Sequence, residues 1–319
     1  MLAPNLVRMS RLVLLLFLPL FISRPNTSFA FSTPQGLDNP VSRIVLPTIP
    51  AKGEPEAQYK LACSLLFSPH PDPVSAVVPL RSAASRHFAP AEFLLGYLYE
   101  KGKGVPVDYA QAAEYYRAAA QQGYAPAENN LGGLYHNGRG VPKDMTLAFE
   151  AYRASALHGN AVAQYNLAAA YYRGYGTDIN LAKAVEWLHS AAEQGVAAAQ
   201  ANLSRLYFQG VGVPVDYAQA AHWALLAAQQ GLPHAAMNYA YLCEHGLGVP
   251  RSYVDAYLWY SRALAAGDTS AMAHLKQVSH HLSPSQRDHA NSVLAADASH
   301  SQEPLAGGAN SDLSLIENP

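Results

Sequence analysis

The side chains that could hold a metal or act as a nucleophile are scattered along the chain. Thirteen histidines are present, yet no two of them are four residues apart, the spacing that places two ligands on one helix face. The adjacent His280 and His281 would point in different directions on a helix, and we interpret them as solvated surface. The sequence contains no G-x-S-x-G, H-E-x-x-H, S-x-x-K or C-x-x-C motif. We therefore predict no catalytic residue, no metal site and no cofactor.

Phosphate and thiol chemistry find little support either. The stretch Gly102-Lys103-Gly104 superficially matches a phosphate loop, but it follows a predicted helix rather than a strand, and a glycine stands where Ser or Thr would hold magnesium. The two cysteines, Cys63 and Cys243, are too few for a disulfide scaffold and are predicted to be buried and unpaired. Charged residues make up only 14% of the chain, against roughly 25% in an ordinary soluble domain. The sequence thus predicts no nucleic-acid binding.

Residues 1–30 are organised like a secretory signal peptide. Two arginines precede the apolar run LVLLLFLPLFI, and a small-x-small cleavage site ends at Ala30. The run is about half the ~20 residues that span a bilayer, and Pro19 interrupts it. Removal of this segment takes three arginines and no acid, leaving 18 bases against 23 acids. We predict a cleaved, periplasmic or secreted chain with no stable membrane insertion; an uncleaved anchor is the alternative.

One motif recurs along the chain. The sequences GKGVPVDYAQAAEYYRAAAQQG and GVGVPVDYAQAAHWALLAAQQG begin at Gly102 and Gly210, 108 residues apart. Glycines mark the intermediate copies at a period of 36 residues, at 102, 138, 174, 210 and 246, at 104, 140, 176, 212 and 248, and at 123, 159, 195, 231 and 267. A period that holds without insertion over five units predicts a repeat architecture rather than an active site assembled once from unlike pieces.

Each repeat is predicted to contain two helices. Ala163, Leu167 and Ala170 recur at helical spacing, which predicts a first helix over about 163–173, ended by the Gly-x-Gly pair. The second helix is predicted to begin after an N-cap, at Asp108, Asp144, Asn180, Asp216 and Ser252. Glutamines at 111 and 219 stand where a capping box places its return partner. An aromatic column, Tyr115, Trp187, Trp223 and Trp259, is interpreted as core packing on the second helices.

The segment from Ala163 to Gly195 contains A-x-Y-N-L-A-x-x-Y-x-x-G-x-G and K-A-V-E-W-x-x-x-A-A-E-Q-G, which closely resemble the Sel-one-like repeat family, a relative of the tetratricopeptide repeats. The resemblance extends from Ala91 to about Ala290. A lone pair of short helices cannot bury enough surface to be stable, so each repeat must pack on its neighbours. We therefore predict an all-α fold, a right-handed superhelical α-solenoid of 36-residue helix-turn-helix repeats.

The two ends of the repeat array differ from its middle. Upstream, PHPDP replaces the glycine loop; downstream, the L-S-P-x-Q-R stretch from Leu282 resembles the start of a closing helix common in this family. The predicted organisation is a signal peptide over 1–30, a disordered linker over 31–52, a degenerate N-terminal capping repeat over 53–90, five Sel-one-like repeats over 91–270, C-terminal capping helices over 271–297 and a disordered tail over 298–319.

The surface of the first helices carries the candidate binding residues. In tetratricopeptide-type solenoids the first helix of each repeat lines a concave groove, and the resemblance implies the same arrangement. Helical spacing predicts an exposed arc of rings and amides on these helices, and rings supply contact area while amides pair with a peptide backbone. The candidates are Tyr97, Asn130, Tyr165, Asn166, Tyr172, Asn202, Arg205, Phe208, Asn238 and Tyr241.

Four of these candidates, Asn130, Asn166, Asn202 and Asn238, recur at the repeat period. Two interpretations of this asparagine ladder stay open. The amides could tie neighbouring repeats together, or they could hold the backbone of a bound partner.

The leading functional hypothesis is an exported, non-enzymatic scaffold or adaptor that binds a partner protein or peptide in the concave groove. The alternative is a protein that binds cell-wall glycan or peptidoglycan fragments, because tyrosine rings also stack on sugars. Some cysteine-rich relatives have been described as β-lactamase-like, but this chain lacks their paired cysteines and any nucleophile motif. We accordingly predict that the protein is not an enzyme.

Overall fold

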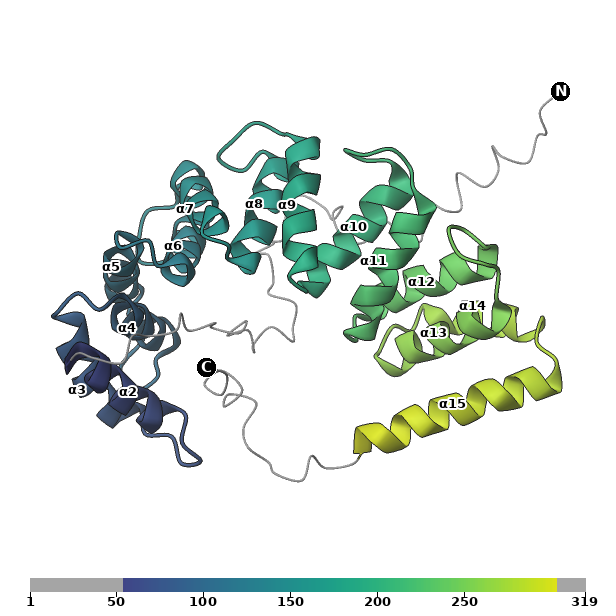
Figure 1. Cartoon of the computed structure of the whole chain (residues 1–319), viewed down its shortest axis with the longest axis horizontal. Helices are drawn as coiled ribbons and strands as arrows, with labels where there is room; N and C mark the ends of the chain where they lie inside the picture. Colours follow the sequence, from purple (N-terminus) through teal and green to yellow (C-terminus); the bar gives the residue numbers. More distant parts are fainter. Residues whose placement is uncertain (1–53, 303–319) are drawn as a thin grey trace. The chain divides into compact units, whose positions relative to one another are not determined.

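The computed structural model describes residues 54–302, with side chains described as far as Asp297, and all regular secondary structure in this range is α-helical (Figure 1). The predicted signal peptide (1–30), the predicted linker (31–52) and residues 303–319 of the predicted tail lie outside the described residues. The helices are α2 (Glu54–Leu66), α3 (Pro73–Ala84), α4 (Ala89–Lys101), α5 (Tyr109–Ala120), α6 (Ala125–Asn137), α7 (Met145–Leu157), α8 (Ala161–Arg173), α9 (Leu181–Glu193), α10 (Ala197–Gln209), α11 (Tyr217–Gln229), α12 (Pro233–His245), α13 (Tyr253–Ala265), α14 (Ala271–Ser279) and α15 (Pro284–Gln302).

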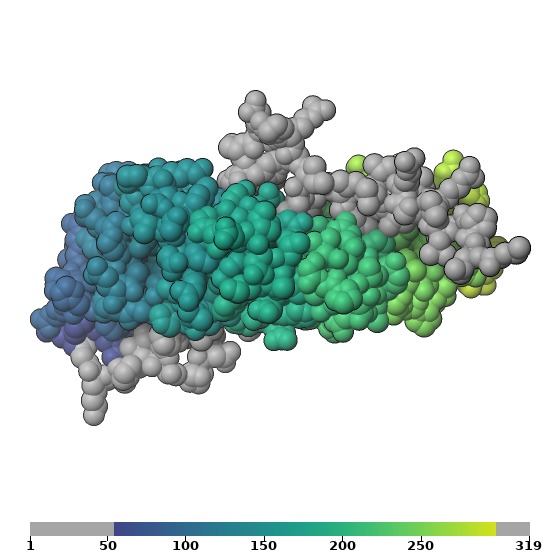
Figure 2. Space-filling view, turned by 90° about the horizontal axis from the view of Figure 1, so that it is seen from above, coloured from purple at the N-terminus to yellow at the C-terminus, as the bar shows by residue number. Residues whose placement is uncertain are grey.

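The described chain forms two compact units. We call residues 54–190 the N-terminal unit and residues 191–302 the C-terminal unit, so the division falls within α9. We call α4, α6, α8, α10 and α12 the A helices of the five repeats, and α5, α7, α9, α11 and α13 the B helices. Inside each unit, repeats that follow each other in sequence are also neighbours in space, and the colour therefore changes gradually along the surface (Figure 2). The predicted all-α repeat solenoid is confirmed.

Each A helix ends at a glycine in the left-handed conformation. Helix α8 ends at Arg173 as predicted and begins at Ala161, two residues before the predicted start. Gly174 has a φ of 74°, which a glycine adopts without steric cost, and its N–H donates to the carbonyl of Ala170 at 2.8 Å. The chain is thereby turned out of the helix and directed back toward the B helix.

The loop between the A and B helices is held by the same backbone bond in every repeat. In the second repeat the N–H of Asp144 donates to the carbonyl of Tyr135 at 3.0 Å. The Asp144 carboxylate then accepts from the N–H groups of Thr146 and Leu147 at 2.9 and 3.0 Å, so the predicted N-cap is confirmed. The other N-caps, which also bond the first turn of their B helices, are Asp108, Asn180, Asp216 and Ser252.

The predicted capping box at the start of α5 is wrong. The Gln111 side chain donates to Glu114 at 2.9 Å instead of returning to Asp108. The reason is that the Asp108 N–H already donates to the carbonyl of Tyr99, at 3.0 Å. The same loop bond, from Asp216 to Tyr207, occupies the N–H that Gln219 was expected to accept from.

A second glycine of each loop lets two repeats approach backbone to backbone. Gly140 has a φ of 68°, and a Cβ added to it would overlap the backbone of Tyr109 and Ala110 at the start of the preceding B helix. Gly176 and Gly248 meet the preceding B helix in the same way, and Gly104 meets the start of α3. These positions set the distance between consecutive repeats, because only a residue without a side chain fits there.

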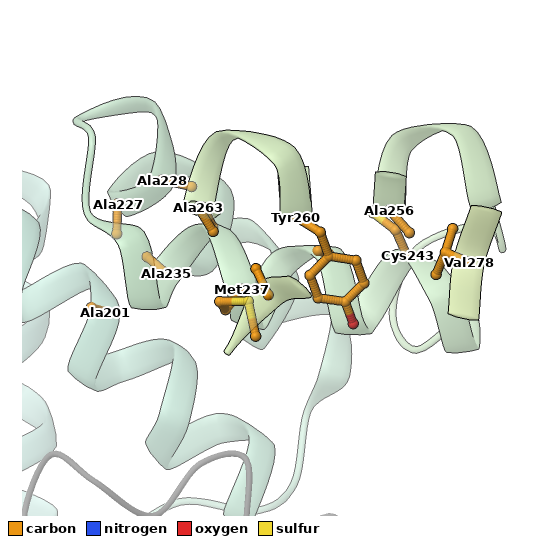
Figure 3. Packing of buried hydrophobic residues seen from close by; sticks show 13 residues of the cluster. Ala201, Ala227, Ala228, Ala235, Met237, Cys243, Ala256, Tyr260, Ala263 and Val278 are labelled. Carbon is orange, nitrogen blue, oxygen red and sulfur yellow. The ribbon is translucent and has the colours of Figure 1, made fainter. Parts of the chain in front are cut away.

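The core of each unit lies between the A and B helices and is rich in alanine. In the C-terminal unit, Ala256, Ala263 and the fully buried Tyr260 of α13 pack against α12 and α14 (Figure 3). The aromatic column on the B helices is only partly inside this core. Trp223 is 7% exposed, whereas Trp187 and Trp259 are partly buried.

The ends of the array are helical as well. Helices α2 and α3 pack as a pair ahead of the first full repeat, and His87, with a φ of 57°, occupies the place that a glycine takes in later repeats. Helix α15 begins after Ser283 and continues to Gln302, which corrects the predicted start of the disordered tail at residue 298. The helix continues because no glycine or proline interrupts it before Pro304. Cys63 and Cys243 are buried and free.

Candidate functional site

The outward side of the A helices is the surface on which the sequence placed the binding residues. We call it the A-helix face and describe it separately in each unit. In the N-terminal unit it is formed by α4, α6 and α8, and five of the predicted residues lie there. All five are partly exposed, and they are Tyr97, Asn130, Tyr165, Asn166 and Tyr172. The expected exposure is confirmed for this unit.

A chain of hydrogen bonds crosses the face of the N-terminal unit and joins three repeats. The amide of Asn166 on α8 donates to the Oδ1 of Asn129 at 2.9 Å, and the Asn129 amide donates to the Oδ1 of Asn130 at 3.2 Å. The Asn130 amide then donates to the hydroxyl of Tyr116 at 3.2 Å, and Tyr116 donates to Glu100 at 2.8 Å. We call these five residues the amide chain. Every bond in it runs in the same direction, toward a carboxylate.

The negative charge of Glu100, at the end of the amide chain, is partly balanced by neighbouring lysines. Glu100 also pairs with Lys101 at 3.1 Å, and the ammonium groups of Lys101 and Lys103 lie 6.0 and 5.7 Å from the ring centre of Tyr97. Burial, followed by the nearby Glu100 charge, raises the pKa of Tyr116 well above its ordinary value. Tyr116 is therefore a neutral hydroxyl at any physiological pH, and it donates to Glu100 while it accepts from Asn130.

The C-terminal unit presents a different face. Asn202, Arg205, Phe208 and Tyr241 on α10 and α12 are all buried, so their predicted exposure is wrong. Rings of consecutive A helices pack on each other here: Phe208 lies 6.2 Å from Tyr241 and 5.3 Å from Tyr217 of α11, between ring centres. For Phe208 and Tyr241, helical spacing failed because it considers one helix at a time and does not include these neighbours.

The asparagine ladder is not uniform. Asn130 and Asn166 bond to residues of the preceding repeat, through Tyr116 and Asn129, which favours the interpretation that the amides tie repeats together. Asn238 is partly exposed, and its side chain makes no hydrogen bond to any residue in the described part of the chain. The Oδ1 of Asn166 likewise has no donor among these residues. The ladder thus contributes to the fold and also presents open acceptors.

Sequence analysis missed a pair of residues that the structure repeats near each end of the array. The hydroxyl of Tyr260 donates to Glu244 at 2.8 Å, as Tyr116 does to Glu100. Glu244 also accepts from Gln277 of α14 at 3.3 Å. In both cases the glutamate precedes the tyrosine by 16 residues. That spacing, which joins the end of an A helix to the middle of its B helix, was the available signal.

The described residues contain no cluster of three or more His, Cys, Asp or Glu that could hold a metal ion. Across the same range, every helix is too short or too polar to cross a membrane. Titratable side chains instead form structural pairs, such as His158 with Glu128 at 2.9 Å and His234 with Asp268 at 2.9 Å. The arrangement of these described residues offers hydrogen bonding and aromatic contact area.

Comparison with known proteins agrees with this geometry. No curated protein matches the chain. A family model described as the Sel1 repeat matches six segments, which are 55–76, 89–124, 125–160, 161–196, 197–232 and 233–268. The first of them lies in α2 and α3, where a degenerate repeat was predicted.

Two solved structures are similar in sequence and in fold. One is a protective antigen present in uropathogenic Escherichia coli strains, 32% identical with a TM-score of 0.68, and the match covers 71% of this chain and 49% of that one. This chain therefore spans about half the length of that relative. The other is a Sel1 repeat protein from Oxalobacter formigenes, 30% identical with a TM-score of 0.62, covering 70% of this chain and 87% of that one. With its six matched repeats, the chain belongs to the Sel1 repeat family.

Proposed function

We propose that this protein is an exported, non-enzymatic scaffold that binds a partner protein through an extended segment lying on the A-helix face. Sel1 repeats generally mediate protein–protein interaction, and the family is generally a non-enzymatic scaffold. The similar structure from uropathogenic Escherichia coli is a protective antigen, which is compatible with a role outside the cytoplasm.

The observation that carries the proposal is the combination of partly exposed rings and amides on α4, α6 and α8. Tyr97 and Tyr165 supply partly exposed ring area, and the ammonium groups of Lys101 and Lys103 lie near the Tyr97 ring. Each asparagine amide of the amide chain uses one N–H in the chain and keeps a second, and the Oδ1 of Asn166 is open. An extended backbone presents alternating N–H and C=O groups, so donors and acceptors on one face can pair with it.

The test is affinity capture from the native envelope, with residues 31–319 as bait, followed by calorimetric titration of the purified partner. Tyr97→Ala is expected to weaken binding by roughly 5- to 150-fold, since an interface aromatic contributes about 1–3 kcal/mol. Leu147→Ala is the matched control, because Leu147 is an apolar side chain, 45% exposed, on the B helix α7. Equal affinity of the Tyr97 variant, or saturable binding of peptidoglycan fragments in place of a protein, would contradict the proposal.

Export rests on the arginine-flanked apolar run and the cleavage site that ends at Ala30. The expected mature chain begins at Phe31 and is recovered outside the cytoplasm. N-terminal sequencing of the protein from fractionated cells checks this. A retained Met1 in the membrane or cytoplasmic fraction would contradict it.

A further inference from the structure

A hydroxyl that extends from a B helix to the A helix α6 lacks the partner that its counterparts have. Tyr152 of α7 is 9% exposed, and its hydroxyl makes no hydrogen bond to any described residue. The equivalent tyrosines of the first and fifth repeats, Tyr116 and Tyr260, both donate to a glutamate at 2.8 Å. With no partner in the described part of the chain, this hydroxyl is available to bond a ligand without breaking a bond of the fold.

Local substitutions account for the missing partner. The second repeat has His136 where Glu100 and Glu244 stand, and the His136 ring contacts Tyr175 instead, with ring centres 5.5 Å apart. The amide that could have reached Tyr152 from the next repeat, Asn166, donates to Asn129. Burial raises the pKa of Tyr152 well above its ordinary value, so the hydroxyl keeps its proton.

The part of helix α6 that lies beside this hydroxyl consists of two glycines. Gly132 and Gly133 are adjacent in the middle of α6, a position where glycine destabilises a helix relative to alanine. Gly132 has a steric reason, because a Cβ added there would lie 2.8 Å from the Tyr152 ring. At position 133 no neighbouring described atom requires a glycine. Its added Cβ would meet only the Tyr152 hydroxyl, at an ordinary 3.9 Å.

We infer that Gly133 and Tyr152, here called the Gly133 site, form a binding position for the main chain of an extended peptide, whose carbonyl oxygen accepts a hydrogen bond from the Tyr152 hydroxyl. This inference rests on the proposed function and deepens it. Gly133 is partly exposed, so the missing side chain leaves room for another backbone to approach α6 closely. Asn129 and Asn130, one helical turn away, each keep one N–H for the same peptide.

The chemistry at this position favours a peptide over a sugar. A sugar is held by stacking on the face of an aromatic ring, but the Tyr152 ring lies against Gly132 and is buried. The site therefore offers one hydroxyl, a bare stretch of helix and flanking amides. These groups pair with C=O and N–H, which alternate along an extended main chain.

The first experiment needs no ligand and compares the two adjacent glycines. Gly133→Ala is expected to keep or raise the melting temperature, since alanine favours the helix and meets no close neighbour. Gly132→Ala is expected to lower it, because the Tyr152 ring must move.

The same experiment compares two tyrosines. Tyr152→Phe should leave the melting temperature unchanged or raise it, whereas Tyr116→Phe, which loses the hydrogen bonds to Glu100 and from Asn130, should lower it. A lower melting temperature for Gly133→Ala would show that the glycine serves the fold and would overturn the inference.

The second experiment measures binding, with random dodecapeptides displayed on phage as the probe and residues 31–319 as the target. A peptide enriched on the wild-type protein is synthesised and titrated against each variant. Tyr152→Phe should weaken binding about 3- to 10-fold, the range of one neutral hydrogen bond, and Gly133→Ala should weaken it at least as much.

The outcomes separate the two proposals. Enriched peptides that bind Tyr97→Ala weakly but Gly133→Ala and Tyr152→Phe normally would overturn the Gly133 site and leave the proposed function intact. If no peptide is enriched on the wild-type protein, both are overturned.

Discussion

The backbone contact between repeats makes a sharp prediction about Gly140. Replacement by alanine places a Cβ on a residue with a φ of 68°, where it would overlap the backbone of Tyr109 and Ala110. Gly159 is a matched control, because it has a φ of 84° and an added Cβ there would meet nothing within 4 Å. Gly159→Ala therefore carries the conformational cost alone, whereas Gly140→Ala adds the collision.

The expected magnitudes follow from these two contributions. A left-handed conformation costs an L-residue about 1–2 kcal/mol, which is the loss expected for Gly159→Ala. A forced backbone shift at a packed contact adds about 1–3 kcal/mol. The free energy of unfolding of Gly140→Ala should thus fall by about 2–5 kcal/mol, or roughly 5–15 °C in melting temperature for a domain of this size.

Urea titration and thermal melting, both followed by far-ultraviolet circular dichroism, measure the difference. Hydrogen exchange locates it, since amides of α5 and α6 should lose protection first in the Gly140 variant. If Gly140→Ala proved no less stable than Gly159→Ala, the second loop glycine would not set the distance between repeats, and the reasoning would be refuted.

Three further predictions concern stability and reactivity. Trp223→Ala should lower the free energy of unfolding by about 3–5 kcal/mol because Trp223 is 7% exposed. A smaller loss than that caused by Trp187→Ala, which removes a partly buried ring, would contradict the place of Trp223 in the core when both variants are compared by urea titration. Asp144→Ala removes the acceptor for two N–H groups at the start of α7 and should cost about 1 kcal/mol; an unchanged urea midpoint would speak against the cap. Burial raises the pKa of Cys243 from 9.0 to about 11, so the unfolded thiol ionises first and the free energy of unfolding should decrease as the pH rises from 9.0 toward 11. A thiol reagent at pH 8 should accordingly react slowly with the native protein and fully in denaturant; rapid native labelling would place a cysteine at the surface.

Sequence periodicity was sufficient to predict the fold because each repeat contains residues that end its A helix and begin its B helix. Gly174 and its equivalents ended the A helices where expected, and Asp144 and its equivalents began the B helices. Sequence alone could not exclude the capping box at Gln111. The box fails because the Asp108 N–H that Gln111 would accept from donates to the carbonyl of Tyr99, a loop bond that helical spacing does not predict.

The same reasoning predicted only part of the candidate site. Spacing on one helix placed Tyr97 and Asn130 correctly on an exposed face. It failed for Phe208 and Tyr241, which cover each other across two repeats. The partners of a side chain, such as those of Asn130, are set by neighbouring helices and not by the spacing within one helix.

The central claim is that a partner lies on the A-helix face, and site-specific photocrosslinking tests it most directly. A photoreactive phenylalanine analogue is introduced at Tyr97 on α4 in one variant and at Leu147 on α7 in another, and each is irradiated in the native envelope. We predict a crosslinked partner from position 97 and none from position 147. A crosslink formed from position 147 alone would place the interaction on the B helices and contradict the account.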